Sequence, residues 1–342
     1  MSERVDELVK GILEGQQRAV ARAIRLIDDR VKGYRELCAR LFPHTGRAYV
    51  LGVTGSPGSG KSSLVDALVG YYRKHDLRVG VVAVDPSSPY SGGAILGDRI
   101  RMQRHFLDEG VFIRSIATRG TLGGLSQSAT EVTRVLDAYG CDVVIVETVG
   151  VGQDELDIAG LAHTTVVVTA PGLGDDIQAV KAGILEIADV FVVNKADRAG
   201  ADAAVADLEH MIGLGKETMS VDVSGHGHGH GLPPQPLDAA SEDTWTPQVI
   251  KTCATQGMGI EALADACQQH RQYLKETGQG QAQQAIRLER ECLGVFRETV
   301  LIHAQNVLGQ ALEAGLERVR TFQEDPYTVA ERLAQMASGD NI

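Results

Sequence analysis

Short runs of valine and isoleucine recur through the middle of the chain, and glycine or polar residues bound each run. They are Ala48–Thr54, Val79–Val84, Val111–Ile116, Val143–Val146, Val166–Thr169, Val190–Val193 and Val249–Lys251. Continuous apolar runs are typical of strands that are buried on both faces of a parallel sheet. Stretches between them, such as Ser62–Arg73 and Ile177–Ile187, have helical spacing instead. The alternation predicts an α/β fold with a doubly wound, mostly parallel sheet.

Both ends of the chain have helical periodicity without strands. From Val5 to Leu41 the apolar spacing predicts two amphipathic helices, and Pro43 stops the second. After Gln279 the apolar residues form one helical stripe, and Pro326 begins a last short helix. The stripe consists of Ile286, Leu293, Phe296, Val300, Leu301, Ala304, Leu308, Leu312 and Leu316. Packing against the core or self-association as a homodimer would bury it.

These patterns predict three parts. Residues 1–45 form an N-terminal helical extension, residues 46–276 the α/β domain, and residues 277–342 a C-terminal helical arm. Within the middle part, residues 219–243 interleave His226, His228 and His230 with glycine and are followed by two prolines. Such composition is typical of a flexible surface insertion.

Composition narrows the class of protein. The net charge of −12 repels phosphate backbones and anionic lipid, so we expect neither nucleic acid nor a membrane as the main partner. The five cysteines are widely spaced and include no CxxC pair, which favours reduced thiols. No run reaches the ~20 apolar residues of a spanning helix. The N-terminus mixes acidic and basic residues and leads into no apolar run, so we expect neither a secretory signal nor an acid-poor transit peptide. The expected location is the cytoplasm.

A phosphate-binding loop follows the first predicted strand and opens a helix, which is the context that supports a Walker A motif. Its candidate nucleotide-binding residues are Gly55, Ser56, Pro57, Gly58, Ser59, Gly60, Lys61, Ser62 and Ser63. Glycines let backbone N–H groups curl around phosphates, and the helix N-terminus adds positive potential. We expect Lys61 to reach the β- and γ-phosphates and the Ser62 hydroxyl to ligate Mg²⁺.

Three acidic residues are candidates to complete the Mg²⁺ site with Ser62. Asp85 ends the second strand, Asp98 follows Leu96-Gly97, and Glu147 ends the strand that begins at Val143. An acid at the carboxyl end of a buried parallel strand faces the ligand crevice, and Mg²⁺ prefers hard oxygen ligands. Asp98 has an alternative role as a helix cap.

The sequence Asn194-Lys195-Ala196-Asp197 ends another valine-rich strand and has the NKxD pattern that reads guanine. The Asp197 carboxylate can accept from guanine N1–H and from the exocyclic amine, whereas adenine offers an acceptor at N1. Lys195 is expected along the base and sugar. Cys253 and Ala254 follow a later strand and occupy the loop whose backbone N–H contacts the guanine oxygen. The predicted cofactors are therefore GTP or GDP with Mg²⁺.

With these residues in place, the chain resembles the MeaB/ArgK/methylmalonic-aciduria-type-A family of P-loop GTPases. The resemblance covers most of the chain. Its motifs are Gly55–Ser63, Asp85-Pro86-Ser87-Ser88, Gly92–Arg99, Glu147–Gln153 and Asn194–Asp197. It implies a GTPase that acts as a chaperone of an adenosylcobalamin-dependent acyl-CoA mutase, with Asp85, Asp98 and Glu147 bordering the metal.

The resemblance also implies an additional switch at Gly172–Lys181, through which such proteins sense their mutase. Asp175 and Lys181 are the switch residues carried over, and they join Lys61 and Glu147 as candidates for the catalytic response. Gln153 is a candidate to position water, or alternatively a surface residue at a helix start. Two features depart from the family: the histidine-glycine insertion is longer than expected, and Cys253 stands where serine is usual.

Two other functions remain open at this point. A nickel or other metal-insertion GTPase would use the histidines of the insertion, since imidazole suits nickel and zinc, although alternating glycines do not pre-form a site. A protein kinase or ATPase would conflict with the guanine-reading pattern. Hydrolysis is expected to be slow without a partner, because stimulation of such enzymes is worth about 10³ to 10⁵ in rate.

Overall fold

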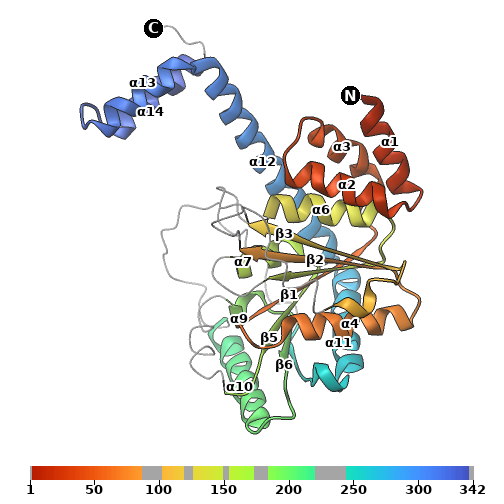
Figure 1. Ribbon diagram of the computed structural model, residues 1–342. Coiled ribbons are helices and arrows are strands. Elements are labelled where there is room, and N and C mark those ends of the chain that lie inside the picture. The colour runs from red at the N-terminus through yellow and green to blue at the C-terminus, as the bar shows by residue number, and fades with distance from the viewer. Residues whose placement is uncertain are drawn as a thin grey trace. The chain divides into compact units, whose positions relative to one another are not determined.

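A computed structural model describes residues 2–86, 102–118, 126–148, 154–172, 184–219 and 244–338. The chain divides into two compact units, Met1–Gln281 and Ala282–Ile342. Figure 1 shows the strands and flanking helices of the first unit. None of the helices in the described ranges combines the length and apolar character needed to cross a membrane.

The described residues of the first unit include a seven-stranded sheet with the order β3-β2-β4-β1-β5-β6-β7. The strands are β1 (Tyr49–Gly55), β2 (Val79–Pro86), β3 (Val111–Thr118), β4 (Val143–Thr148), β5 (Thr164–Thr169), β6 (Val190–Val193) and β7 (Gln248–Lys251). Every pairing among them is parallel. The predicted strands are thus confirmed, and so is the doubly wound α/β fold. Because β1 lies between β4 and β5, the loop after it opens where such sheets bind ligands.

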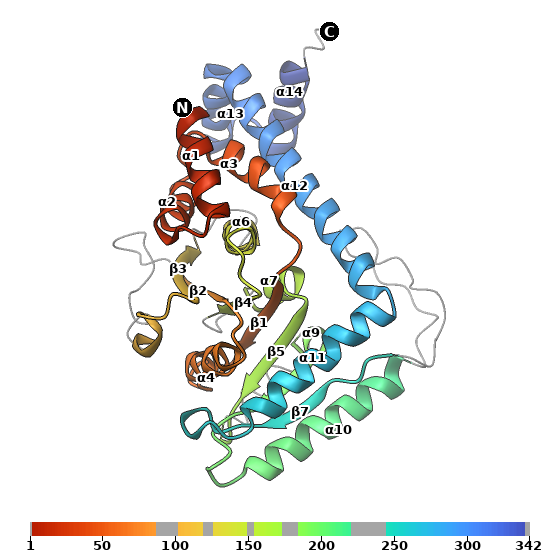
Figure 2. The same ribbon diagram turned by 90° about the vertical axis from the view of Figure 1, so that its right-hand side faces the viewer.

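Helices cover both faces of this sheet (Figure 2). On one face lie α4 (Lys61–Lys74) and α11 (Ile260–Glu276), and on the other lie α6 (Ser126–Ala138), α7 (Asp154–Leu161) and α10 (Ala201–Met219). Neighbouring strand residues point to opposite faces, so Leu51 belongs to the α4 side while Val50 belongs to the α6 side. Short elements complete the unit: η1 (Phe42–His44), η2 (Gln103–His105), α9 (Ile184–Ile187) and η4 (Ala254–Gln256).

Three helices precede β1, so the prediction of two was wrong. They are α1 (Ser2–Leu13), α2 (Gln17–Asp28) and α3 (Tyr34–Leu41). Arg30 and Gly33 adopt left-handed backbone, with φ of 49° and 102°, and a right-handed helix cannot continue through such residues. The Arg30 guanidinium donates to both carboxylate oxygens of Glu131 on α6, at 2.9 and 2.8 Å. The extension is therefore part of the first unit and packs on α6.

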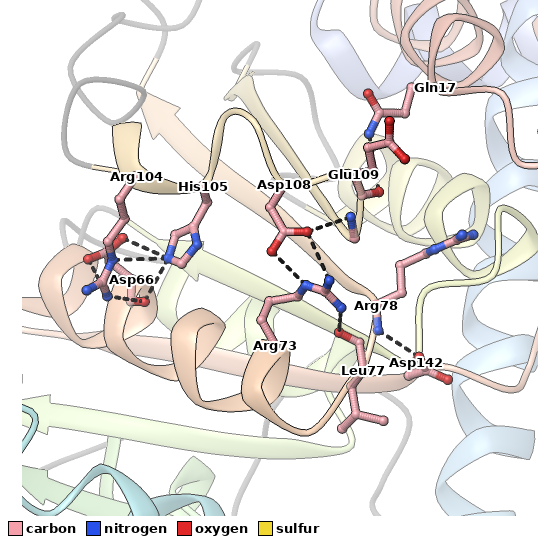
Figure 3. A network of polar contacts seen from close by, with 11 residues as sticks. Gln17, Asp66, Arg73, Leu77, Arg78, Arg104, His105, Asp108, Glu109 and Asp142 are labelled. Carbon is pink, nitrogen blue, oxygen red and sulfur yellow. Dashed lines mark hydrogen bonds and ion pairs between the residues drawn. The ribbon is translucent and has the colours of Figure 1, made fainter.

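Ion pairs join the chain segment that leads into β3 to helix α4 (Figure 3). Arg104 and His105 both contact the Asp66 carboxylate, at 2.7 and 3.2 Å. Two turns further along α4, the Arg73 guanidinium forms a bidentate ion pair with the Asp108 carboxylate, and each of the two hydrogen bonds is 2.9 Å long. The hydrogen bonds from Arg73 hold the pKa of Asp108 below its usual value. Helix α4, whose first residue is Lys61, is thus anchored at two points along its length.

The second unit is helical. Helix α12 (Gln279–Leu308) leads into this unit, which contains α13 (Gln310–Arg320) and α14 (Pro326–Ser338). Pro326 begins the last helix, as predicted. Gly309, with φ of 46°, separates α12 from α13, so the expected apolar stripe is divided between two helices. Helices α13 and α14 pack closely, because a Cβ added to Gly315 would lie 2.9 Å from Val329. Burial of the stripe in a homodimer stays a prediction.

Candidate nucleotide-binding site

The loop between β1 and α4 requires glycine at two positions. Gly55 has φ of 131°, and a Cβ there would lie 2.0 Å from the carbonyl oxygen of Val168. Gly60 has φ of 93°, and its Cβ would lie 2.4 Å from the Asn194 amide nitrogen. Both positions combine a backbone conformation that favours glycine with a close approach of another strand end. The loop therefore has the tight backbone path that phosphate binding needs.

Lys61 is the first residue of α4 and is almost fully buried. Its Nζ donates to the carbonyl oxygens of Gly55 at 2.6 Å and Ser56 at 3.0 Å. These bonds hold the ammonium across the loop instead of letting it extend into solvent. A buried cation above a loop of backbone amides, at a helix N-terminus, provides strong attraction for phosphate.

Ser62 and Glu147 are brought together from α4 and β4. The Ser62 hydroxyl donates to Glu147 Oε1 at 2.7 Å, and both side chains are buried. The contact follows from the sheet, because Glu147 is paired with Val53 of β1 at the start of the loop. A hydroxyl and a carboxylate are hard oxygen donors of the kind that Mg²⁺ binds. This pair fits a magnesium ion at the phosphate side of the site.

The other proposed metal ligands are less fully described. Asp85 lies near the end of β2. The preceding residue, Val84, pairs with Thr148 of β4, so the Asp85 backbone is close to the end of β4 that carries Glu147. The Asp85 side chain and all of Asp98 lie outside the described residues. Within the described part of the chain, no group of three or more histidine, cysteine or acidic side chains could hold a metal. The complete Mg²⁺ ligand set stays a prediction.

Asn194 connects two loops of the site. Its Nδ2 donates to the carbonyl oxygen of Ser59 at 2.9 Å, within the phosphate loop. Its Oδ1 accepts from the Thr252 hydroxyl at 3.1 Å and from the backbone N–H of Ala254 at 3.2 Å. The residue follows β6 and is buried. Because Nδ2 bonds the phosphate loop and Oδ1 bonds the loop after β7, the amide fixes the spacing between the phosphate loop and the predicted guanine loop.

Lys195 also reaches the phosphate loop. Its Nζ donates to the carbonyl oxygen of Gly58 at 2.5 Å. Lys195 has a positive φ of 58°, which is uncommon outside glycine. This conformation turns the chain sharply after the buried Asn194, and Asp197 then lies exposed in the next turn. The motif thus presents one buried and one exposed polar side chain on the same strand end.

The loop after β7 forms a closed turn beside Asp197. Cys253 and Met258 exchange backbone hydrogen bonds at 3.0 and 3.2 Å. The Cys253 Sγ lies 3.3 Å from Asp197 Oδ1. Gly259 closes the turn at φ of 75°, with the carbonyl oxygen of Lys251 only 2.1 Å from where a Cβ would be. The turn holds Ala254 in place with its N–H directed at the Asn194 oxygen.

The structure therefore gathers most of the predicted nucleotide-binding residues at the carboxyl ends of β1, β4, β6 and β7. Within the phosphate loop, Ser59 is buried, whereas Pro57 and Ser63 are exposed. Gln153, Asp175 and Lys181 lie outside the described residues and stay predictions. The sequence interpretation missed Thr252, whose hydroxyl bonds Asn194; a threonine at the end of a strand has no distinguishing sequence signal.

Comparison with known proteins agrees with this geometry. The model of a family described as the methylmalonyl-CoA mutase-associated GTPase MeaB matches residues 20–307. A Pyrococcus abyssi protein is 43% identical over 99% of this chain and 98% of its own length. A mouse protein named methylmalonic aciduria type A homolog, mitochondrial, is 30% identical over 87% of this chain and 71% of its own.

A solved structure extends the similarity to the fold of the whole chain. The crystal structure of an LAO/AO transport system kinase has a TM-score of 0.65 at 25% identity, with 99% of each chain covered. The match of the family model spans the phosphate loop, the strand end with Glu147 and the NKxD sequence. The chain therefore belongs to the MeaB family and is a P-loop GTPase.

Proposed function

We propose that this GTPase is a chaperone of an adenosylcobalamin-dependent acyl-CoA mutase. It gates the loading and release of cobalamin, protects the loaded enzyme, and acts in the cytoplasm as a homodimer through its C-terminal arm. The description of the matching family names association with methylmalonyl-CoA mutase, and a mouse relative carries the name of a methylmalonic aciduria protein. These names support a mutase as the partner class.

The observation that carries the nucleotide assignment is the position of Asn194 between two loops. Its amide bonds the carbonyl of Ser59 and the N–H of Ala254, so the phosphate loop and the base loop have a fixed separation. In our proposal the first loop and Lys61 bind the phosphates. Asp197 reads guanine, and Lys195, Cys253 and Ala254 border the base.

We propose that the residues around the phosphates promote hydrolysis by compensating negative charge and by positioning the reacting groups. Lys61 offsets the negative charge of the β- and γ-phosphates, and Ser62 and Glu147, with Asp85 and Asp98, would hold Mg²⁺. The ion, when bound, neutralises charge that develops on the phosphoryl oxygens. Gln153 is proposed to orient the attacking water. Because this chemistry depends on positioning, a partner that reshapes the switch at Asp175 and Lys181 can raise the rate.

Calorimetric titration with GDP and ADP tests the base assignment. The wild-type protein should bind GDP much more tightly than ADP, because adenine N1 would face the Asp197 carboxylate. Asp197→Asn should weaken GDP binding and favour the xanthine nucleotide, whose C2 carbonyl oxygen can accept from the new amide. Equal affinities of the wild type for GDP and ADP would contradict the assignment.

Transfer of cobalamin tests the chaperone role. A coupling of binding free energies is reciprocal, so GTP and GDP should change how readily the mutase takes up or releases its cofactor in the presence of this protein. The measurement is cobalamin binding to a panel of purified acyl-CoA mutases with each nucleotide. Identical transfer with GTP, GDP and no nucleotide, for every mutase, would remove the chaperone proposal and leave the GTPase.

A metal-insertion role is the alternative, and its histidine tract lies outside the described residues. Deleting residues 225–231 should leave GTP turnover and mutase coupling unchanged if the mutase proposal is right. Stoichiometric, tight Ni²⁺ binding by the wild type that the deletion removes would favour metal insertion instead.

A further inference from the structure

Two buried hydroxyl groups meet at the carboxyl ends of β1 and β4. The Thr148 hydroxyl on β4 donates to the Thr54 hydroxyl on β1 at 2.8 Å. The residues are 1% and 0% exposed, so bulk water does not compete for either hydroxyl. A buried hydroxyl without a partner costs free energy, and threonine has little freedom at χ1. The contact is therefore a fixed link between the two strands.

This link lies one residue beyond the backbone register of β1 with β4. The last backbone pair of the two strands is Val53 with Glu147. Thr54 and Thr148 are the next residue of each strand, and their side chains make the contact that follows. The backbone of β1 then enters the phosphate loop at Gly55. The hydroxyl pair therefore holds β4 beside β1 at the start of this loop.

The end of β4 is held on both faces of the sheet. Consecutive side chains of a strand point to opposite faces. Glu147 meets Ser62 of α4 at 2.7 Å on one face. Thr148, the next residue, meets Thr54 on the other face, which α6 and α7 cover. A metal ion bound by Ser62 and Glu147 would use the oxygen atoms of their direct bond, whereas the bond between the threonines uses none of them.

We propose that Thr54 and Thr148 are positioning residues for Mg²⁺: their hydrogen bond holds the end of β4, and with it the Glu147 carboxylate, in place beside the phosphate loop. The inference rests on the proposed binding of Mg²⁺ by Ser62 and Glu147, and it adds the residues that support one of these ligands. A ligand that is held in place before the ion arrives loses less conformational entropy on binding.

A positioning role differs measurably from a contribution to stability alone. A hydroxyl pair that only completes the core would affect the free energy of unfolding and leave the response to Mg²⁺ unchanged. A pair that holds Glu147 in place would also set how strongly Mg²⁺ raises the affinity for a guanine nucleotide. The ratio of affinity with Mg²⁺ to affinity without it separates the two roles, because a general loss of binding cancels in the ratio.

The first measurement tests the bond itself, by denaturant unfolding of the full chain without nucleotide or Mg²⁺. Thr148→Val and Thr54→Val each keep the shape of the side chain and remove one hydroxyl. Each should lower the folding equilibrium constant about tenfold, because the other hydroxyl is left buried without its partner. The double variant leaves neither hydroxyl, so it should be no less stable than either single variant. Losses that multiply in the double variant would contradict the bond.

Thr133→Val is the matched control. Thr133 on α6 is also buried, and its hydroxyl has no hydrogen-bond partner in the part of the chain that the structure describes. The same substitution there removes a hydroxyl without breaking a bond, so the folding equilibrium constant should not fall.

The second measurement is the calorimetric affinity of the full chain for a non-hydrolysable GTP analogue, with saturating Mg²⁺ and with EDTA. We expect Thr148→Val and Thr54→Val to lower the ratio of the two affinities about fivefold, the worth of about one neutral hydrogen bond. Thr148→Ser keeps the donor, and it should stay within about twofold of the wild type, as should Thr133→Val. If a single variant does not fold, the double variant gives the same comparison, because it leaves no unpaired hydroxyl.

An unchanged ratio in the valine variants would overturn the positioning role, even where stability falls. If Glu147→Gln lowers the ratio while Thr148→Val keeps it, only the role of the threonines fails. If Mg²⁺ does not raise the affinity of the wild type, or Glu147→Gln keeps the wild-type ratio, the proposed metal site fails as well.

Discussion

The side-chain amide of Asn194 donates to the main-chain carbonyl of Ser59 at 2.9 Å, across 135 positions of sequence. Ser59 lies inside the phosphate loop, and Asn194 follows a strand two places away from β1 in the sheet. Because the opposite side of the same amide bonds Thr252 and Ala254, one buried side chain spans the site. The spacing between the loop after β1 and the loop after β7 is therefore built into the fold.

Replacing Asn194 should damage stability and binding together. Asn194→Asp keeps an acceptor for Thr252 and Ala254 but places a carboxylate oxygen against the Ser59 carbonyl. We expect it to lower the free energy of unfolding by about 3 kcal/mol, because a buried acceptor pair replaces a hydrogen bond, and to weaken GDP at least tenfold. Thr252→Val, which removes only one donor to the same amide, should cost about 1 kcal/mol. Denaturant unfolding and calorimetry measure both effects; equal costs for the two variants would contradict this account.

Two glycines of the phosphate loop offer a matched comparison. Gly60 and Gly58 both have positive φ, but a Cβ on Gly60 meets the Asn194 amide at 2.4 Å, whereas a Cβ on Gly58 meets nothing within 4 Å. Gly58→Ala should cost about 1 kcal/mol of backbone strain. Gly60→Ala adds a steric clash, so it should cost more and reduce GDP affinity further. If thermal unfolding and GDP titration give the same result for both, the close approach of Asn194 has no energetic consequence.

Lys61 and Glu147 should affect hydrolysis in different ways. Lys61→Ala removes the charge that is proposed to bind the phosphates, so GTP turnover should fall below detection while circular dichroism shows an intact fold. Glu147→Gln keeps the size of the side chain but removes the negative charge of the proposed Mg²⁺ ligand. Turnover of that variant should need more Mg²⁺ for half-maximal activity. A normal Mg²⁺ dependence in Glu147→Gln would exclude this carboxylate from the metal site.

His270 on α11 is a buried group at the other end of the sheet. Its ring nitrogens lie 2.8 Å from the Thr164 hydroxyl and 3.3 Å from the Asp189 carboxylate, and it is 2% exposed. Burial lowers the pKa of His270 to about 4, from 6.5 for an ordinary histidine. Below pH 6.5 the unfolded chain therefore binds a proton that the folded chain does not, and acid favours unfolding.

This shift predicts a specific pH dependence of stability. The contribution of His270 is constant above about pH 7, and at pH 5.5 it should lower the free energy of unfolding by about 1.4 kcal/mol. Trp245, the only tryptophan of the chain, lies 4.8 Å from the His270 ring and reports unfolding by its fluorescence. The His270→Gln variant should be less stable overall. Between pH 8 and pH 5.5, however, its free energy of unfolding should fall by about 1.4 kcal/mol less than that of the wild type. A parallel pH profile of both proteins would show that His270 does not titrate as described.

The sequence predicts the sheet well because its strands are continuous apolar runs. The run from Val143 to Val146 has no polar face, so only a strand buried on both sides accommodates it. The break after α2 was missed because it begins at the left-handed Arg30, a residue type with no preference for that conformation, and because the single Gly33 that follows is tolerated in many helices. The division of the C-terminal stripe at Gly309 was also missed, since one glycine is tolerated in many helices.

Within the site, motif residues could be predicted and their contacts could not. Local spacing identifies Lys61 and Asn194, because each belongs to a short motif at a strand end. The bonds from Asn194 to Ser59 and from Cys253 to Asp197 join residues far apart in sequence, and only the strand order brings them together. The roles of Asp98, Gln153, Asp175 and Lys181 stay predictions.

Partner stimulation tests the proposed chaperone role most directly. The measurement is GTP turnover of the full chain with and without each purified cobalamin-dependent acyl-CoA mutase. We expect the right mutase to raise turnover at least tenfold, a change of about 1.4 kcal/mol in the activation barrier. In Lys181→Ala and Asp175→Ala the ratio of stimulated to unstimulated turnover should fall toward one. A turnover that stays flat across the whole panel, for a wild-type protein that binds GTP, would contradict the proposal.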